Sequence, residues 1–181
     1  MVRSFYNGER FGLESHVLMG HAMLSAIAGS LGDFETARRH TDGFHALYDL
    51  ERDSQLAPLH NMKCLNDGWA AHHLWIMGWP DQAKKVADDI VVHARLIGNP
   101  FHLILCLAHG GACFFYRREA DPLHAWLDEA SRLAKEHVLD FLDAMLIAIW
   151  RGGALVVGGR YAEGYAVSTA ASAVSIAANS P

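Results

Sequence analysis

Between Gly78 and Gly98 the chain shows its clearest pattern of apolar and polar positions. Apolar residues recur there at intervals of three and four, which places them on one face of a helix. These residues are Ala83, Val86, Ala87, Ile90, Val91 and Ala94. Gly78 can adopt the left-handed conformation that ends a preceding helix, and Pro80 suits the first position of the next one. The pattern therefore predicts a complete amphipathic helix with a turn at either end.

The same pattern of helix, turn and helix is repeated along the chain. When the second helix of each pair is aligned, Ala37, Ala83, Leu123 and Gly164 take corresponding positions, at spacings of 46, 40 and 41 residues. A period of about 40 residues with two helices in each unit is typical of α-solenoids, in which stacked hairpins bury a continuous core. The sequence therefore predicts an all-α fold, an α-solenoid of about four helical hairpins.

The hairpins are expected to form a single helical-repeat domain over residues 14–181, after a lead-in of residues 1–13. Their approximate limits are 14–48, 60–97, 100–137 and 140–177. The polar segment after residue 48 is the longest connection, and it accounts for the one larger spacing between repeats.

Adjacent glycines interrupt two of the expected helices, at Gly110–Gly111 and at Gly152–Gly153. A double glycine destabilises a helix by about 2 kcal/mol relative to alanine. We therefore expect these pairs to serve another purpose, which is to let a neighbouring helix approach closely.

Composition and charge exclude several classes of protein. The chain has 181 residues, of which 51% are hydrophobic and 19% charged, so it can bury a core and is not globally disordered. A net charge of -5 argues against a nucleic-acid-binding surface, which normally needs a basic stripe. No apolar run approaches the roughly 20 residues of a membrane span, and the start lacks the apolar core of a secretory signal. Three cysteines argue against a disulfide framework, so we expect a cytoplasmic location.

Four stretches of the chain carry motifs of a known family. They are GSLGDFETARRHTDGFHALYD (Gly29–Asp49), LWIMGWPDQA (Leu74–Ala83), ARLIGNPFHL (Ala94–Leu103) and the frame from Arg117-Arg118-Glu119 to Glu136-His137. Together they resemble the tetratricopeptide-like C-terminal region of large bacterial signalling proteins. In that family the repeats follow an ATPase module, with a nucleotide cyclase or a winged-helix DNA-binding domain further upstream. The resemblance covers residues 29–165 and implies a right-handed, tetratricopeptide-like superhelix with a regulatory role.

Motifs that would support catalysis are missing from the sequence. It contains neither the phosphate-binding loop Gly-x-x-x-x-Gly-Lys-Ser/Thr nor a Gly-x-Ser-x-Gly nucleophile elbow. No cysteine lies at a convincing helix N-terminus, where its thiol would be activated. We therefore expect that the chain is not an enzyme, and no activity of the resembling family is transferred to it.

Twelve histidines raise the question of metal binding. The sharpest set is His102, Cys106, His109 and Cys113, whose spacings of four, three and four place them on one face of a helix. Zinc uses such ligands, but a tetrahedral site usually draws them from more than one element. Four ligands over three turns span about 16 Å, which is more than one ion can bridge. We therefore predict no metal site and no cofactor, although one pair of these residues could share an ion with another helix.

The repeat register places six residues on the face that lines the concave groove of a superhelix. They are His72 and Trp75, with Met19 as their counterpart in the first hairpin and Leu105, Ala112 and Phe115 in the third. A lining of aromatic, thioether and imidazole groups suits an apolar helix, an extended peptide or a small ligand. The alternative is that these residues pack against a neighbouring hairpin or a dimer partner.

These observations predict a non-catalytic interaction and regulatory module. It would bind a peptide, a helix or another domain of its own parent chain on the concave face. The alternative function is a small-molecule sensor within a signalling protein, with the ligand in the groove or between hairpins. Homodimerisation is compatible with both, because the ends of an open solenoid expose apolar faces unless they are capped.

Overall fold

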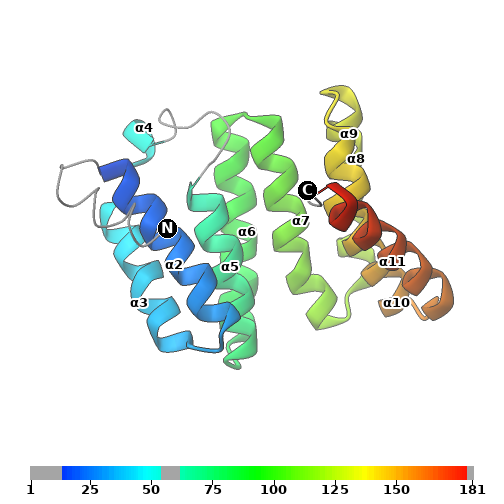
Figure 1. The fold of residues 1–181 in the computed structure, drawn as a ribbon, viewed down its shortest axis with the longest axis horizontal. Coiled ribbons are helices and arrows are strands. Elements are labelled where there is room, and N and C mark those ends of the chain that lie inside the picture. The colour runs from blue at the N-terminus through cyan, green and yellow to red at the C-terminus, as the bar shows by residue number, and fades with distance from the viewer. Residues whose placement is uncertain (1–13, 54–61, 179–181) are drawn as a thin grey trace. The chain divides into compact units, whose positions relative to one another are not determined.

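The computed structural model describes residues 14–53 and 62–178, and all regular elements in these ranges are helices (Figure 1). They are α2 (Glu14–Ser30), α3 (Phe34–Leu47), α4 (Leu50–Asp53), α5 (Met62–Ile76), α6 (Pro80–Ile97), α7 (Pro100–Arg117), α8 (Ala120–Glu136), α9 (Asp140–Leu142), the π-helical turn η1 (Asp143–Ile147), α10 (Ala148–Val157) and α11 (Tyr161–Ala178). The predicted all-α class is confirmed for these ranges. The predicted lead-in and part of the long connection lie outside them. No helix in the described ranges is both long enough and apolar enough to cross a membrane.

Consecutive helices of the chain form antiparallel pairs. α2 packs on α3, α5 on α6, α7 on α8 and α10 on α11, in the order that the repeat pattern predicts. The pairs belong to two compact units, which we call unit 1 (Met1–Ile97) and unit 2 (Gly98–Pro181). Unit 1 contains the first two pairs, drawn from blue to green in Figure 1, and unit 2 contains the other two.

Glycines with positive φ end helices where the sequence predicts turns. The φ angle is 87° at Gly78 and 71° at Gly98, in the left-handed region that glycine adopts without steric penalty. After α7 and α8 the same conformation falls on Arg118 (φ 59°) and Val138 (φ 56°). Those two helix ends therefore lack the glycine signal that marks the others.

One buried cluster of unit 1 lies between the helices of its first pair, and a residue of the second pair packs against it. Leu18, Ala22 and Phe44 make a buried cluster, and Tyr48 and Met62 pack against it. α5 packs against both α2 and α3. The second pair, which begins with α5, is thereby held against the first pair. This junction brings together the polar residues described below.

The glycines of unit 2 lie at close helix contacts. A methyl group added at Gly152 would lie 2.7 Å from the carbonyl oxygen of Gly164, and one added at Gly164 would lie 2.5 Å from that of Gly152. On α7, a methyl group at Gly111 would lie 3.0 Å from Cδ1 of Leu123. The prediction that paired glycines serve close approach is confirmed at Gly152, where a larger residue would meet the backbone of α11. At Gly111 a methyl group would need only a small shift of the Leu123 side chain.

The first helix of the fourth predicted hairpin is interrupted by η1, which the sequence pattern does not predict. Oδ1 of Asp143, in η1, accepts a hydrogen bond of 2.5 Å from Oγ of Ser131 on α8. The same hydroxyl oxygen accepts a hydrogen bond of 2.8 Å from Nη2 of Arg151 on α10. A π turn adds one residue to the helical turn and shifts the register that follows it. The contacts that accompany it are tertiary, so local periodicity does not reveal them.

Candidate functional site

The residues predicted to line the groove lie on three helices. Met19 is on α2 and exposed, while His72 and Trp75 are on α5 and partly buried. Because α2 and α5 pack against each other, these three residues of unit 1 lie on adjacent helices. The other three predicted residues lie on α7 in unit 2; they are Leu105, Ala112 and Phe115.

The residues of unit 2 contribute mainly to packing. Ala112 is fully buried, so it supports its helix and offers no surface to a partner. Phe115 is half-buried and meets the ring of Trp150 edge-on, with 6.0 Å between ring centroids. A methyl group added at Gly153 would lie 3.1 Å from the ring of Phe115. Phe115 also lines a surface pocket of about 370 Å³, together with Tyr116, Arg118, Val156, Val157 and Tyr161.

The candidate metal ligands all lie along α7, since His102, Cys106, His109 and Cys113 belong to that one helix. Across residues 14–53 and 62–178, no three His, Cys, Asp or Glu side chains come close enough to hold a metal ion. Burial lowers the pKa of His109, which favours its neutral form.

A larger pocket, of about 440 Å³, lies in unit 1, and sequence reasoning missed it. It is bounded by α3, α5 and the start of α6. Its apolar lining residues are Ala70, Leu74, Met77, Trp79 and Val86, and its polar ones are Arg38, Thr41, Asp42, His45, His73 and Gln82. We call it the α3–α5 pocket. Its volume lies in the range of small-molecule sites, roughly 300–1,000 Å³.

Arg38 and Trp79 form one side of the α3–α5 pocket. The guanidinium carbon of Arg38 lies 5.9 Å from the centroid of the Trp79 ring, within the range of a cation–π contact. Nε of Arg38 is 3.8 Å from Oδ2 of Asp42, and both side chains are largely exposed. An ion pair of this length in water adds little stability. The position of the guanidinium therefore depends more on the indole than on the carboxylate.

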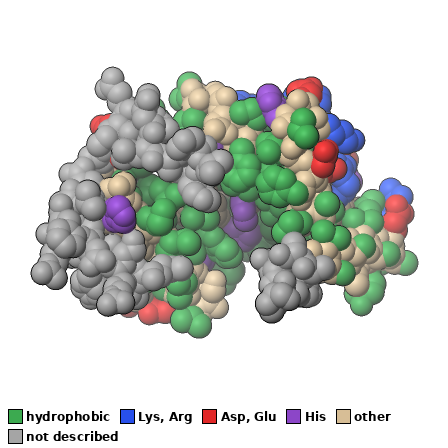
Figure 2. Space-filling model, turned by 45° about the horizontal axis from the view of Figure 1, so that its top comes forward, with side chains coloured by type: hydrophobic (Ala, Val, Ile, Leu, Met, Phe, Trp, Pro, Cys, Tyr) green, Lys and Arg blue, Asp and Glu red, His purple; other side chains and the backbone are tan. Residues whose placement is uncertain are grey.

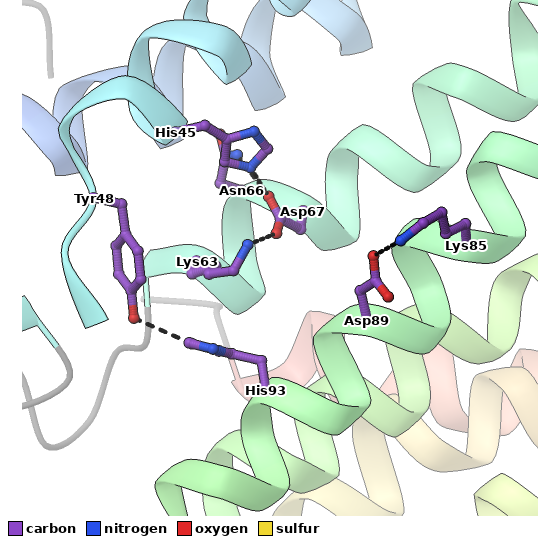
Figure 3. Close-up of polar contacts among 8 residues, drawn as sticks. All are labelled: His45, Tyr48, Lys63, Asn66, Asp67, Lys85, Asp89 and His93. Carbon is purple, nitrogen blue, oxygen red and sulfur yellow. Dashed lines mark hydrogen bonds and ion pairs between the residues drawn. The ribbon is translucent and has the colours of Figure 1, made fainter. Parts of the chain in front are cut away.

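A buried carboxylate supports the polar side of the same pocket (Figure 3). The side chain of Asp67, on α5, is only 4% exposed. It accepts hydrogen bonds from Nε2 of His45 at 2.6 Å, from Nζ of Lys63 at 2.5 Å and from Nδ2 of Asn66 at 2.9 Å. Burial alone would raise the pKa of Asp67, but the hydrogen bond from His45 and the charge of Lys63 hold its pKa below the usual value. Asp67 thus fixes His45, which lines the pocket.

Tyr48 extends this network to α6. Its hydroxyl lies 3.1 Å from Nε2 of His93, as Figure 3 shows. Nζ of Lys63 lies 5.9 Å from the centroid of the Tyr48 ring, and the ring of Phe44 stacks on that of Tyr48 with 5.4 Å between ring centroids. We call the set His45, Tyr48, Lys63, Asn66, Asp67 and His93 the junction network. It joins α3, α5 and α6 through contacts between residues distant in sequence.

His73 lines the α3–α5 pocket and is buried where α5 meets α2. It is 5% exposed, and its ring lies 5.9 Å from that of Phe34. A methyl group added at Gly29 would overlap the His73 ring. Nε2 of His73 is buried without a hydrogen-bond partner among the described residues, and burial lowers its pKa. The ring is therefore neutral at physiological pH and packs as a hydrophobic group.

Part of the α3–α5 pocket had a signal in the sequence. Arg38, Asp42 and His45 follow each other at intervals of four and three, on the polar face expected for the second helix. The same pattern also describes an ordinary solvated face, so it does not single out a pocket. Trp79 lies in a predicted turn, and only the fold places it beside Arg38.

Comparisons of the chain with protein-family models, with curated proteins and with solved structures return no match. The geometry alone therefore decides which chemistry is open to this chain. The polar groups of the junction network bind one another. Of the two pockets described above, the α3–α5 pocket is the larger.

Proposed function

We propose that the chain is a non-catalytic interaction and regulatory module whose helix pairs stack as a right-handed, tetratricopeptide-like solenoid. Its partner would be a peptide, a helix or another domain of a parent signalling protein, as the family resemblance implies. The three cysteines are buried thiols, which supports a reducing, cytoplasmic setting. Homodimerisation through exposed apolar helices is compatible with this role.

The observation that carries the proposal is the apolar surface of α2 and α5. Met19 and Ile27 on α2 and Ile76 on α5 are exposed although they are large and hydrophobic. His72 and Trp75, also on α5, are partly buried. Figure 2 shows apolar side chains at the surface on the face that it presents. Apolar residues grouped on adjacent helices are typical of protein-interaction sites, whereas single ones are common on any surface.

The polar interior supports binding rather than catalysis. In the junction network, Asp67 is satisfied by His45, Lys63 and Asn66. A group that abstracts a proton must reach the substrate, but the Asp67 carboxylate is buried and already accepts three hydrogen bonds. Asp67 therefore acts as a structural group.

Selection of peptides on the immobilised full chain tests this function. We expect selected peptides to present apolar residues at helical spacing, because the exposed surface follows two helices. The substitution Ile76→Lys should abolish their binding by placing a charge on that surface. Val92→Lys on α6 is the matched control, since Ile76 and Val92 are both 58% exposed. If both substitutions weaken peptide binding equally, or if neither weakens it, α2 and α5 do not form the binding site.

A small-molecule sensor is the second candidate function, and the α3–α5 pocket is the observation that favours it. The pocket combines an apolar lining with polar side chains from α3 and α6, which is the usual character of a ligand site. A ligand held there would contact both helix pairs of unit 1. It would therefore stabilise their packing and couple occupancy to the shape of the unit.

A further inference from the structure

We propose that the α3–α5 pocket binds a small carboxylate whose body is apolar and aromatic, an inference that rests on the sensor function given above. The apolar part of the lining requires such a body. Leu74 and Met77 come from α5, Val86 comes from α6, and the indole of Trp79 stands at the turn between these helices. An aromatic ring of the ligand would replace water against these side chains and pack on the indole.

Arg38 supplies the group that selects a carboxylate. It is the one permanent cation among the described residues of the lining. Among the described residues, its one ion pair is the 3.8 Å contact of Nε with Asp42, which is longer than a hydrogen bond. Neither Arg38 nor Gln82 makes a side-chain hydrogen bond within residues 14–53 and 62–178. The Nη donors of Arg38 are thus available to a planar carboxylate, which a guanidinium can bind through two parallel hydrogen bonds.

The surrounding charges do not oppose an anion at this place. Asp67 is the nearest buried acid to the lining residue His45, and Lys63 neutralises it. Asp42 is largely exposed, so water screens its charge. Gln82, on α6, lines the same pocket as Arg38 on α3. Its amide can donate to the second carboxylate oxygen or to another polar atom of the ligand.

Calorimetric titration of the full chain with 4-phenylbutyrate tests the inference. The uncharged 4-phenylbutyramide keeps the ring and removes the carboxylate. We expect 4-phenylbutyrate to bind, and the amide to bind about tenfold more weakly or worse, because a charge-assisted hydrogen bond is lost. Absence of binding by 4-phenylbutyrate up to millimolar concentration would overturn the inference.

Two arginine variants decide whether Arg38 is responsible. Arg38→Gln should weaken 4-phenylbutyrate about tenfold or more, while leaving the amide unchanged. Arg39→Gln is the matched control, because Arg39 is the next residue of α3, is exposed, and bonds to Thr36 away from the pocket. Its effect should be less than twofold. Equal effects of both substitutions would overturn the assignment to Arg38.

A peptide with a free C-terminal phenylalanine carries the same two groups, and a second titration separates the sources. The inference predicts that 4-phenylbutyrate binds at least as well as the tetrapeptide Ala-Ala-Ala-Phe. Tighter binding of the tetrapeptide, lost when its C-terminus is amidated, would assign the pocket to a peptide end instead. Ile76→Lys separates this test from that of the α2 and α5 surface. It should leave 4-phenylbutyrate binding unchanged, because Ile76 does not line the pocket.

Discussion

At the scale of single residues, the side chain of His73 determines which residue can occupy position 29 on the neighbouring helix. Glycine within a helix usually destabilises it relative to alanine by about 1 kcal/mol. In α2, however, any Cβ at position 29 would overlap the imidazole of His73 on α5. The packing of these two helices therefore requires glycine here, against its poor helix propensity.

The substitution Gly29→Ala should accordingly destabilise the protein. We expect the free energy of unfolding in urea to fall by about 1–3 kcal/mol, the usual range for overpacking. The same substitution in a His73→Ala background is the control, because the shortened side chain leaves room for the methyl group. There the change should be neutral or stabilising. A loss of the same size in both backgrounds would show that the His73 ring is not the obstacle.

Val138 presents the opposite case, a residue that is locally unsuited to its place. Its φ angle is 56° and it is 81% exposed, so it occupies the left-handed region without gaining contacts from burial. For a β-branched residue this conformation is unfavourable by roughly 1–2 kcal/mol. The position follows α8 directly, where glycine is the preferred residue.

Val138→Gly should therefore stabilise the chain by about 1 kcal/mol, because glycine adopts this conformation freely. Thermal unfolding followed by circular dichroism would measure the change. Val92→Gly is the comparison and should lower the stability, because Val92 is also exposed but lies within α6, where glycine disfavours the helix. A Val138→Gly protein that is less stable than the original would contradict the assigned conformation.

At the scale of helices, the junction network joins the first pair of unit 1 to the second. Asp67 on α5 binds His45 on α3, while Tyr48 after α3 reaches His93 on α6. A buried ion pair does not guarantee net stability, but removing one partner leaves the other unpaired in a low-dielectric site. The network thus fixes the register of the two pairs more than it adds to their attraction.

Asp67→Ala should lower the free energy of unfolding by about 2–3 kcal/mol, since Lys63 and His45 lose their buried acceptor. The matched control is Asp89→Ala on α6, where Asp89 accepts a 2.6 Å bond from exposed Lys85 (Figure 3). That substitution should change stability by less than about 0.5 kcal/mol. Similar losses in the two variants would mean that the burial of Asp67 has no energetic consequence.

The helices were predictable where one local property defines them. α6 has a single apolar face between Gly78 and Gly98, and the residues predicted for this face are buried except Val86, which is partly buried. His93 is buried as well, although the predicted face did not include it. The α7–α8 and α8–α9 turns were harder to predict, because Arg118 and Val138 take positive φ without being glycine. The turn η1 was not predictable, since its contacts involve Ser131 on another helix.

The candidate site was less predictable than the helices for a physical reason. A pocket depends on which faces of separate helices come together, whereas helix periodicity reports on each helix alone. The sequence placed His72 and Trp75 on the first helix of their pair, and in the structure they lie there, on α5. It also placed Ala112 on the accessible face, but Ala112 is fully buried. It placed Arg38 on a polar face but gave no sign that Trp79 would lie beside it.

At the scale of the whole molecule, the chain forms two units of paired helices. Unit 1 carries both features on which the proposals rest, the exposed apolar residues of α2 and α5 and the α3–α5 pocket. The two features involve different residues. A protein partner on one and a small ligand in the other could therefore be bound together, and α5, which contributes to both, would couple them.

Hydrogen exchange of the full chain, with and without a peptide selected on it, tests the central claim most directly. Exchange of backbone amides reports which helices a bound partner protects. The account predicts slower exchange in α2 and α5 when the peptide is present, with α8 unchanged. Slower exchange in α8 or α11 alone, with α2 and α5 unaffected, would contradict the claim that the exposed apolar residues of unit 1 form the binding surface.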